Sequence, residues 1–216
     1  MAFDWTRRLR TRRPRRPVTA DLDWRMDTFV AIDLETTGLD PRRDHIVSYG
    51  AVPVRDGRVR TSESVYGLVH VPHDVPASSV KFHGLRTQDL DGAPPLAECV
   101  TILDELIGDH PVVAHCAWVE RSFLRKAFRH SYLTFNSPIV DTAVLARHIL
   151  DVHLEPGQSV SLEYATTALG LPVHSPHHAL GDAVTTASLF IALAGQLERG
   201  EILTTSNLLQ LSEGQP

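Results

Sequence analysis

The hydrophobic pattern of the chain changes about halfway along the sequence, and this change narrows the possible folds. The first half holds three consecutive stretches typical of strands, at residues 28–34, 45–54 and 59–69, with a turn at Asp56-Gly57 between the last two. Consecutive strands with tight connections form an antiparallel meander. The second half alternates short strands with helices, as parallel strands joined by helices do. We therefore expect an α/β fold.

The periodicity of the second half sets the expected positions of its elements. Apolar residues at helical spacing predict a helix over residues 94–108. Ser161 is typical of a helix N-cap and Gly170 of a helix end. Residues 71–91 are expected to form a loop with short helical turns, and residues 200–216 carry only a weak apolar pattern. The remaining predicted elements are strands at 111–114 and 138–140 and helices at 118–128, 142–150, 161–169 and 179–197.

The length and charge distribution of the chain predict one domain with a tail at each end. The 216 residues suffice for one sizeable domain, which we place at residues 26–198, followed by a C-terminal tail at 199–216. Residues 1–16 carry seven arginines against one aspartate, whereas the whole chain has a net charge of −5. We expect residues 1–25 to form a basic, disordered tail before an acidic body. Such a body repels nucleic acid unless bound cations reverse its local charge.

Cysteine content and hydropathy predict where the protein functions. Cys99 and Cys116 are too few for a disulfide framework, and the N-terminus lacks the apolar segment that a secretory signal needs. No apolar run approaches the length of a membrane span, which is about 20 residues. The sequence therefore predicts a cytoplasmic protein without membrane contact.

Two carboxylates stand at the end of the first strand-like stretch, inside an otherwise apolar segment. Asp33 and Glu35 are two residues apart, so on a strand their side chains point to the same face. Paired carboxylates in an apolar place repel each other, but they are stable when they hold a hard divalent cation. The following turn, Thr36-Thr37-Gly38, lets the backbone approach a ligand closely. The segment predicts a metal site, and the alternative is a frayed strand end with two unrelated acids.

Two further segments carry residues with the chemistry of a hydrolytic site. His177 precedes the last long helix and Asp182 lies one turn inside it, so a proton-accepting imidazole and a metal-binding acid can face one site. Glu120 opens another helix and by itself is typical of a helix surface. His115 and Cys116 resemble half of a zinc site, but no second His or Cys pair completes it.

Together these segments resemble the DEDDh family of DnaQ-like 3′–5′ exonucleases, which includes the proofreading epsilon subunit of bacterial DNA polymerase III. The resemblance covers roughly residues 28–196. It implies a ribonuclease-H-like fold with a five-stranded mixed sheet flanked by helices, in which two parallel strands follow three antiparallel ones. The matching segments are residues 29–38, residues 81–85, His115 to Leu124, Asp141-Thr142, and the pair His177 and Asp182.

The resemblance also implies a reaction and roles for single residues. The reaction removes nucleoside 5′-monophosphates from the 3′ end of single-stranded nucleic acid, with DNA as the expected substrate and a DNA polymerase or repair complex as a candidate partner. Four acids would hold two divalent cations, Mg²⁺ or Mn²⁺, one histidine would act as the base, and four residues would contact the terminal nucleotide. The metal ligands would be Asp33, Glu35, Glu120 and Asp182, and the base would be His177. The residues that contact the nucleotide would be Thr36, Thr37, Leu39 and His83.

The second motif departs from the family pattern at three positions. Cys116 stands in place of Asn, Val119 in place of Phe, and Glu120 in place of Asp. The additional methylene of Glu120 moves its carboxylate by about one C–C bond, and displacements near 1 Å reduce catalytic rates strongly. His178 competes with His177 for the role of base, but the four-residue gap to Asp182 favours His177.

Two alternatives to a DNA exonuclease follow from these departures. The first alternative is a degenerate exonuclease kept as a nucleic-acid-binding or scaffold module, since a fold alone does not guarantee chemistry. The second alternative is an exonuclease that acts on short RNA or on damaged nucleotide ends. Aromatic residues able to stack on bases are sparse, and Phe82 and Trp118 are the candidates.

Overall fold

A computed structural model describes residues 23–213 except 154, 156–157 and 199–201. Its single described sheet has the strand order β3-β2-β1-β5-β6, with β4 also paired to β2. The strands β1 to β4 pair antiparallel, whereas β5 and β6 continue the sheet in parallel. The strands are β1 (Thr28–Thr36), β2 (Ile46–Arg55), β3 (Arg58–Val59), β4 (Val65–Leu68), β5 (Val112–Ala114) and β6 (Ile139–Asp141).

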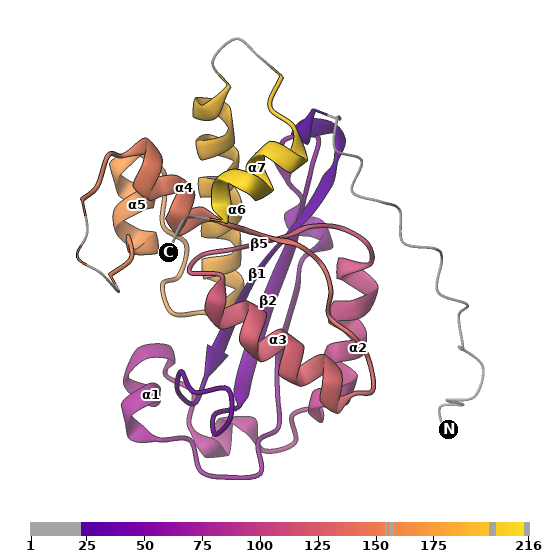
Figure 1. Cartoon of the computed structure of the whole chain (residues 1–216). Helices are drawn as coiled ribbons and strands as arrows, with labels where there is room; N and C mark the ends of the chain where they lie inside the picture. Colours follow the sequence, from indigo (N-terminus) through magenta and orange to yellow (C-terminus); the bar gives the residue numbers. More distant parts are fainter. Residues whose placement is uncertain (1–22, 154, 156–157, 199–201, 214–216) are drawn as a thin grey trace.

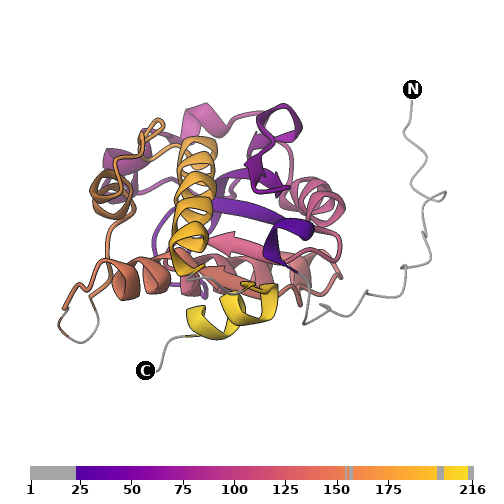
Figure 2. The ribbon, with the colours of Figure 1, turned by 90° about the horizontal axis from the view of Figure 1, so that it is seen from above.

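Helices cover both faces of this sheet (Figures 1 and 2). Alternate residues of β1 divide between two cores: Val30 and Ile32 pack with α2 and α3, whereas Phe29 and Ala31 pack with α4, α6 and α7. The odd-numbered residues of β1, which alternate in the same way as Phe29 and Ala31, therefore face α6. The helices are α1 (Ala77–His83), α2 (Leu96–Ile107), α3 (Trp118–His130), α4 (Thr142–Ile149), α5 (Leu162–Ala168), α6 (Ala179–Leu197) and α7 (Thr205–Ser212).

The α/β architecture and the order of antiparallel and parallel strands are as expected, but the third predicted strand is divided. The expected strand at 59–69 becomes β3 and β4, separated by the 3₁₀ turn Thr61–Glu63, so the sheet has six strands. The turn residues are polar and exposed, and the Ser64 hydroxyl donates to the Thr61 carbonyl. A segment without apolar residues has no face to bury and leaves the sheet.

Residues beyond the two expected domain boundaries also pack against the body. Trp24 is buried and its indole N–H donates to Glu198 at 2.8 Å. Helix α7, where the sequence pattern was weak, buries Leu208 against β6 and α4. The basic tail expected at residues 1–25 lies, for residues 1–22, outside the described residues, and the division of the chain at 25 and 198 stays a prediction.

Within the described residues, one helix, α6, has the length and hydropathy of a membrane span. It meets this description by length and average composition only, because Asp182, Thr185 and Thr186 interrupt its apolar residues. Ten of its 19 residues are buried, and it packs on β1 and β2 (Figure 1). The apolar composition of α6 accordingly serves the core of the domain.

Gly50 lets α6 begin directly against the sheet. Gly50 pairs with Asp33 in the register of β1 and β2, and a Cβ atom on it would lie 2.3 Å from the backbone of Ala179 and Leu180. Gly181 is equally close to the chain on its other side, where a Cβ would lie 2.4 Å from the carbonyl oxygen of His174. These two close approaches bring the first turn of α6 beside the middle of β1.

Gly50→Ala is expected to lower the free energy of unfolding by about 3 kcal/mol, because the methyl group must displace backbone rather than a flexible side chain. Urea denaturation measures this loss. Gly195→Ala is the matched control, since a Cβ there meets nothing within 4 Å in the last turns of α6, and it should stabilise the helix by up to about 1 kcal/mol. Equal stabilities of the Gly50→Ala variant and the wild type would contradict this account of how α6 is seated.

Candidate active site

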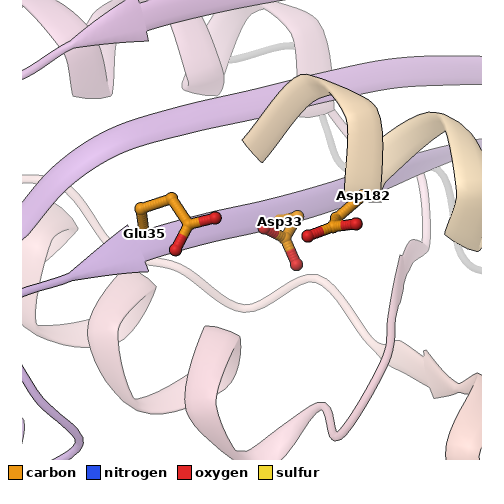
Figure 3. Close-up of side chains that lie close together, drawn as sticks. All are labelled: Asp33, Glu35 and Asp182. Carbon is orange, nitrogen blue, oxygen red and sulfur yellow. The ribbon is translucent and has the colours of Figure 1, made fainter. Parts of the chain in front are cut away.

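Three carboxylates from two elements meet where β1 lies against the start of α6. Asp33 and Glu35 project from β1, and Asp182 projects from the first turn of α6 (Figure 3). One oxygen from each of the three lies within 4.8 Å of the others. Asp33 and Glu35 share the face of β1 that turns toward α6, as their two-residue spacing predicts. Gly50, which pairs with Asp33, has no side chain to keep the start of α6 away from the sheet.

The three carboxylates are held at a distance that opposes their full ionisation. Burial, followed by the charges of Glu120, Glu35 and Asp182, raises the pKa of Asp33 well above its usual range. Burial and then Asp182 raise the pKa of Glu35 to about 7. Burial also raises the pKa of Asp182, although the backbone N–H of His177 opposes this by donating to Oδ2 at 2.8 Å. The protein without metal therefore retains protons here near neutral pH.

Glu120 lies beside this group without being part of the closest three. Its side chain, in the first turn of α3, is 4% exposed, and its Oε2 atom has no hydrogen-bond partner. Burial raises the pKa of Glu120, its own backbone N–H opposes the shift, and Asp141 and Glu35 add to it. Glu120 in turn raises the pKa of Asp33. Its environment is that of a buried acid near other acids, and differs from the exposed helix surface on which a single glutamate is usual.

Asp141 organises the loop that leads into α3. Its carboxylate accepts from the backbone N–H groups of Cys116 at 3.1 Å and Ala117 at 2.8 Å, and it caps α4 by accepting from Ala143 at 2.9 Å. Cys116 has a φ of 60°, a left-handed conformation that these bonds help to hold. Asp141 thus fixes the direction in which Glu120 enters the site. Its motif was recognised in the sequence, but this role was not, because it depends on the pairing of β5 with β6.

His115, considered above as half of a zinc site, has both ring nitrogens engaged. Nδ1 lies 2.9 Å from the Thr142 hydroxyl and Nε2 lies 2.7 Å from the carbonyl oxygen of Val160. These bonds link the end of β5 to α4 and to the segment before α5. His115 has a structural role in this arrangement.

The two candidate bases differ in how the fold uses them. His178 is the N-cap of α6, where its Nδ1 faces the N–H of Gly181 at 3.4 Å and its ring stacks on Tyr66 with centroids 4.5 Å apart. His177 is exposed, has a φ of 60°, and holds Asp182 through its backbone while its ring stays outside hydrogen bonds among the described residues. The imidazole of His177 is therefore the more available of the two, in agreement with its spacing to Asp182.

The residues expected to contact a nucleotide line the loop after β1 and the end of α1. The Thr36 hydroxyl donates to the carbonyl of Gly38 at 2.7 Å, and Leu39 is 62% exposed. Thr37 is buried, and its hydroxyl donates to Asp44 at 3.1 Å, so its side chain is committed to holding the loop. His83 is half-buried and close to Thr36 and His177. Burial lowers its pKa, the backbone of Thr36 opposes this, and His177 adds to the lowering.

The donor set fits hard divalent cations. It consists of carboxylate oxygens, as Mg²⁺ and Mn²⁺ prefer. The mutual repulsion of Asp33, Glu35 and Asp182 and the buried, unpartnered Oε2 of Glu120 are both features that a bound cation would relieve. The fold and this cluster together describe an α/β domain with an acidic cluster that is compatible with metal binding.

Family and sequence relatives agree with that description. Residues 30–190 match the family model of RNase T-type exonucleases, described as Exonuclease, and the chain belongs to this family. The DNA polymerase III subunit epsilon of Aquifex aeolicus is 31% identical over 172 residues, which cover 79% of this chain and 82% of that protein. The PolC-type DNA polymerase III of Thermotoga petrophila is 29% identical over 202 residues, 92% of this chain but 14% of that protein.

Solved structures show the same fold. Escherichia coli exonuclease I, in a zinc-bound complex with single-stranded DNA, matches with a TM-score of 0.69 and 18% identity over 80% of this chain and 42% of that one. Exonuclease X, in complex with 5′-overhanging duplex DNA, matches with a TM-score of 0.66 and 23% identity over 85% of this chain and 99% of that one. The ribonuclease-H-like fold expected from the sequence is thereby confirmed.

Proposed function

We propose that this protein is a metal-dependent 3′–5′ exonuclease that removes nucleoside 5′-monophosphates from the 3′ end of single-stranded DNA. The observation that carries the proposal is the meeting of Asp33, Glu35 and Asp182 within 4.8 Å, next to the buried Glu120, whose Oε2 has no hydrogen-bond partner. Acids held this close are stable as ions only with a cation between them. Family membership supports the choice of phosphodiester hydrolysis over other reactions of acidic sites.

Asp33, Glu35, Glu120 and Asp182 would hold two divalent cations, Mg²⁺ or Mn²⁺. Bound there, the cations would lower the pKa of water and neutralise charge on the scissile phosphate. His177 would accept the proton of the attacking water, because a neutral imidazole can act as a general base and this ring makes no hydrogen bond among the described residues. Its backbone bond to Asp182 ties the position of this base to that of a metal ligand.

The terminal nucleotide is held by the loop after β1 and by α1. Leu39 is exposed enough to contact a base, and His83 is close to both Thr36 and His177. Thr36 and Thr37 act by shaping the backbone of this loop, since their hydroxyls bond to Gly38 and Asp44. The complex of exonuclease I with single-stranded DNA and the names of the polymerase III relatives support a DNA substrate, association with DNA replication or repair, and a cytoplasmic location.

The test is the product formed from single-stranded DNA labelled at its 3′ end, with Mn²⁺. Wild type should release the label as a nucleoside 5′-monophosphate in the first cleavage step, before the rest of the strand is degraded. Glu120→Gln should lower the rate more than about tenfold, and Glu120→Asp, which keeps the charge, should retain more activity than Glu120→Gln. The neutral variant removes a ligand, whereas the shorter acid only displaces one.

The same assay separates the alternative functions. Full activity in Glu120→Gln would exclude Glu120 as a ligand. Shortening of an RNA oligonucleotide but not of DNA would assign the RNA substrate. Inactivity of wild type on both, with activity appearing only in Glu120→Asp, would show a silenced site and favour the binding or scaffold module.

A further inference from the structure

Two hollows lie next to each other along α3 and share the side chain of Lys126 in their walls. The first, of about 480 Å³, opens between α3 and the loop that follows β1, and we call it the basic hollow. The second, of about 140 Å³, opens between α3, the start of β2, the segment after β4 and the start of α2, and we call it the apolar hollow. Because the two hollows share Lys126, one bound segment can occupy both.

The basic hollow carries positive charge that is only partly neutralised. Four of its seven lining residues are Arg or Lys and none is acidic, although the chain as a whole has a net charge of −5. Arg42 pairs with Asp40 at 3.1 Å. Arg125 and Arg129 are exposed, and no acidic side chain in the described part of the chain forms an ion pair with either. Two guanidinium groups thus remain available to an anion.

The apolar hollow has the size and lining of a pocket for one side chain. Most of its wall consists of buried or half-buried apolar residues, and the exposed His70 and Pro72 also line it. A cavity of about 150 Å³ with a comparable lining binds benzene. The apolar hollow therefore has room for the ring of a phenylalanine or the side chain of a leucine. Its apolar residues from the strands, loops and helices are Ile46, Val69, Val71, Leu96, Phe123 and Ala127.

Asp44 is the one acidic residue in the lining of the apolar hollow, and its carboxylate is engaged within the loop after β1. Oδ1 accepts from the Thr37 hydroxyl at 3.1 Å, and Oδ2 accepts from the backbone N–H of Asp40 at 2.8 Å. The carbonyl of Asp44 accepts from Nζ of Lys126 at 2.8 Å, which fastens the loop to α3. The two hollows are therefore features of the packed domain.

The free arginines of the basic hollow point away from the carboxylate cluster. Arg125 and Arg129 follow Glu120 by five and nine residues. At 3.6 residues per turn they lie about 140° and 180° around α3 from Glu120. A molecule bound to these arginines is therefore on the side of α3 opposite to the acids, and a role other than catalysis is indicated.

We propose that the two hollows form a docking site for a segment of a partner protein, in which an aromatic or large aliphatic side chain fills the apolar hollow and neighbouring Asp or Glu residues lie in the basic hollow. Protein interfaces combine a buried anchor in a pocket with charges of complementary sign around it. Arginine also forms bidentate pairs with carboxylates. The proposal is independent of the proposed exonuclease function.

Charge and size favour this occupant over three others. Residues 1–16 carry seven arginines, so the basic hollow repels this part of the chain. A nucleic acid matches the charge, but its phosphates and sugars leave an aliphatic hollow unfilled. A second copy of the chain needs an interface of roughly 20–30 residues on each side for a stable dimer, which is more than line the two hollows.

The test is fluorescence anisotropy with a labelled peptide in which one phenylalanine has three aspartates on each side, so that acids reach the basic hollow in either direction of binding. The combined Arg125→Gln and Arg129→Gln variant should bind this peptide about fivefold more weakly than wild type, because two exposed ion pairs are lost. The combined Arg58→Gln and Arg147→Gln variant is the matched control. It removes the same charge at exposed positions that line neither hollow, and its affinity should stay within about twofold of wild type.

A peptide with alanine in place of the phenylalanine tests the apolar hollow. It should bind wild type more than about tenfold more weakly, because the buried ring is lost. Leu96, the half-buried first residue of α2, forms part of the wall. In Leu96→Ala the preference for the phenylalanine peptide over the alanine peptide should therefore fall about threefold.

Several results would overturn the proposal. These are no binding of the phenylalanine peptide to wild type up to about 1 mM, equal affinities of the two peptides, and equal losses in the two charge variants. A wild-type dimer in light scattering that Arg125→Gln with Arg129→Gln dissociates would assign the surface to a second copy of the chain. Displacement of the peptide by a 12-residue oligothymidylate, with loss of oligothymidylate binding in the same variant, would assign it to nucleic acid.

Discussion

Asp33→Asn is expected to abolish nuclease activity and at the same time to stabilise the protein without metal. Asp33 stands at the centre of the cluster, and Glu120, Glu35 and Asp182 all raise its pKa. Asparagine keeps the shape but removes one charge, so the repulsion among the remaining acids falls. Losing a partner of a metal ligand already costs 10–100-fold, so loss of a ligand should cost more than about 100-fold in rate.

The gain in stability should be about 2 kcal/mol in urea denaturation at pH 8 with EDTA, as expected for relief of repulsion between partly buried charges a few ångströms apart. Asp104→Asn, on α2 and away from the cluster, is the control and should change stability by less than about 0.5 kcal/mol. An active Asp33→Asn variant would remove this residue from the metal site. A loss of stability in the Asp33→Asn variant would show that repulsion among the carboxylates does not destabilise the protein without metal.

The stability of the protein without metal should fall as the pH rises from about 5 to 8. The pKa of Glu35 is raised from 4.5 to about 7, so the folded state keeps a proton that the unfolded state has released. Stability from this proton is complete below the unfolded pKa and is lost as the pH rises through the folded pKa. The difference amounts to about 3 kcal/mol for Glu35, and Asp33 and Glu120 act in the same direction.

Mg²⁺ should reverse this dependence, because it binds the ionised carboxylates and displaces their protons. Urea denaturation at pH 5.5 and 7.5, with EDTA or with Mg²⁺, gives the four stabilities to compare. Stabilisation by Mg²⁺ should be larger at the higher pH. A protein that becomes more stable with rising pH in EDTA would mean that these acids are ionised without a metal and that the explanation is wrong.

The sequence predicted the parts of the site that depend on local spacing. Asp33 and Glu35 lie on one face of β1 because side chains alternate along a strand, and Asp182 lies in the first turn of α6 because the helix begins at residue 179, as its pattern predicts. Ser161 caps α5 as expected, by accepting from the N–H of Tyr164.

Features that depend on contacts between distant segments were not predictable in this way. In the sequence, Gly50 is only a glycine within a predicted strand. Its role, to leave room for the backbone at the start of α6, depends on the packing of α6 against β2. The bonds of Asp141 cross between β6 and the loop after β5. The sheet gained a strand because polar residues interrupt the third predicted strand.

The most direct test of the central claim, that the acids around Asp33 form a divalent-cation site, is the number of Mn²⁺ ions bound per chain, counted from the free-ion electron paramagnetic resonance signal at pH 7.5. We predict two ions per wild-type chain with a nucleoside 5′-monophosphate present, as a two-metal site requires, and fewer in Asp33→Asn. Binding that is absent from the wild type, or that is the same in Asp33→Asn, would contradict the account.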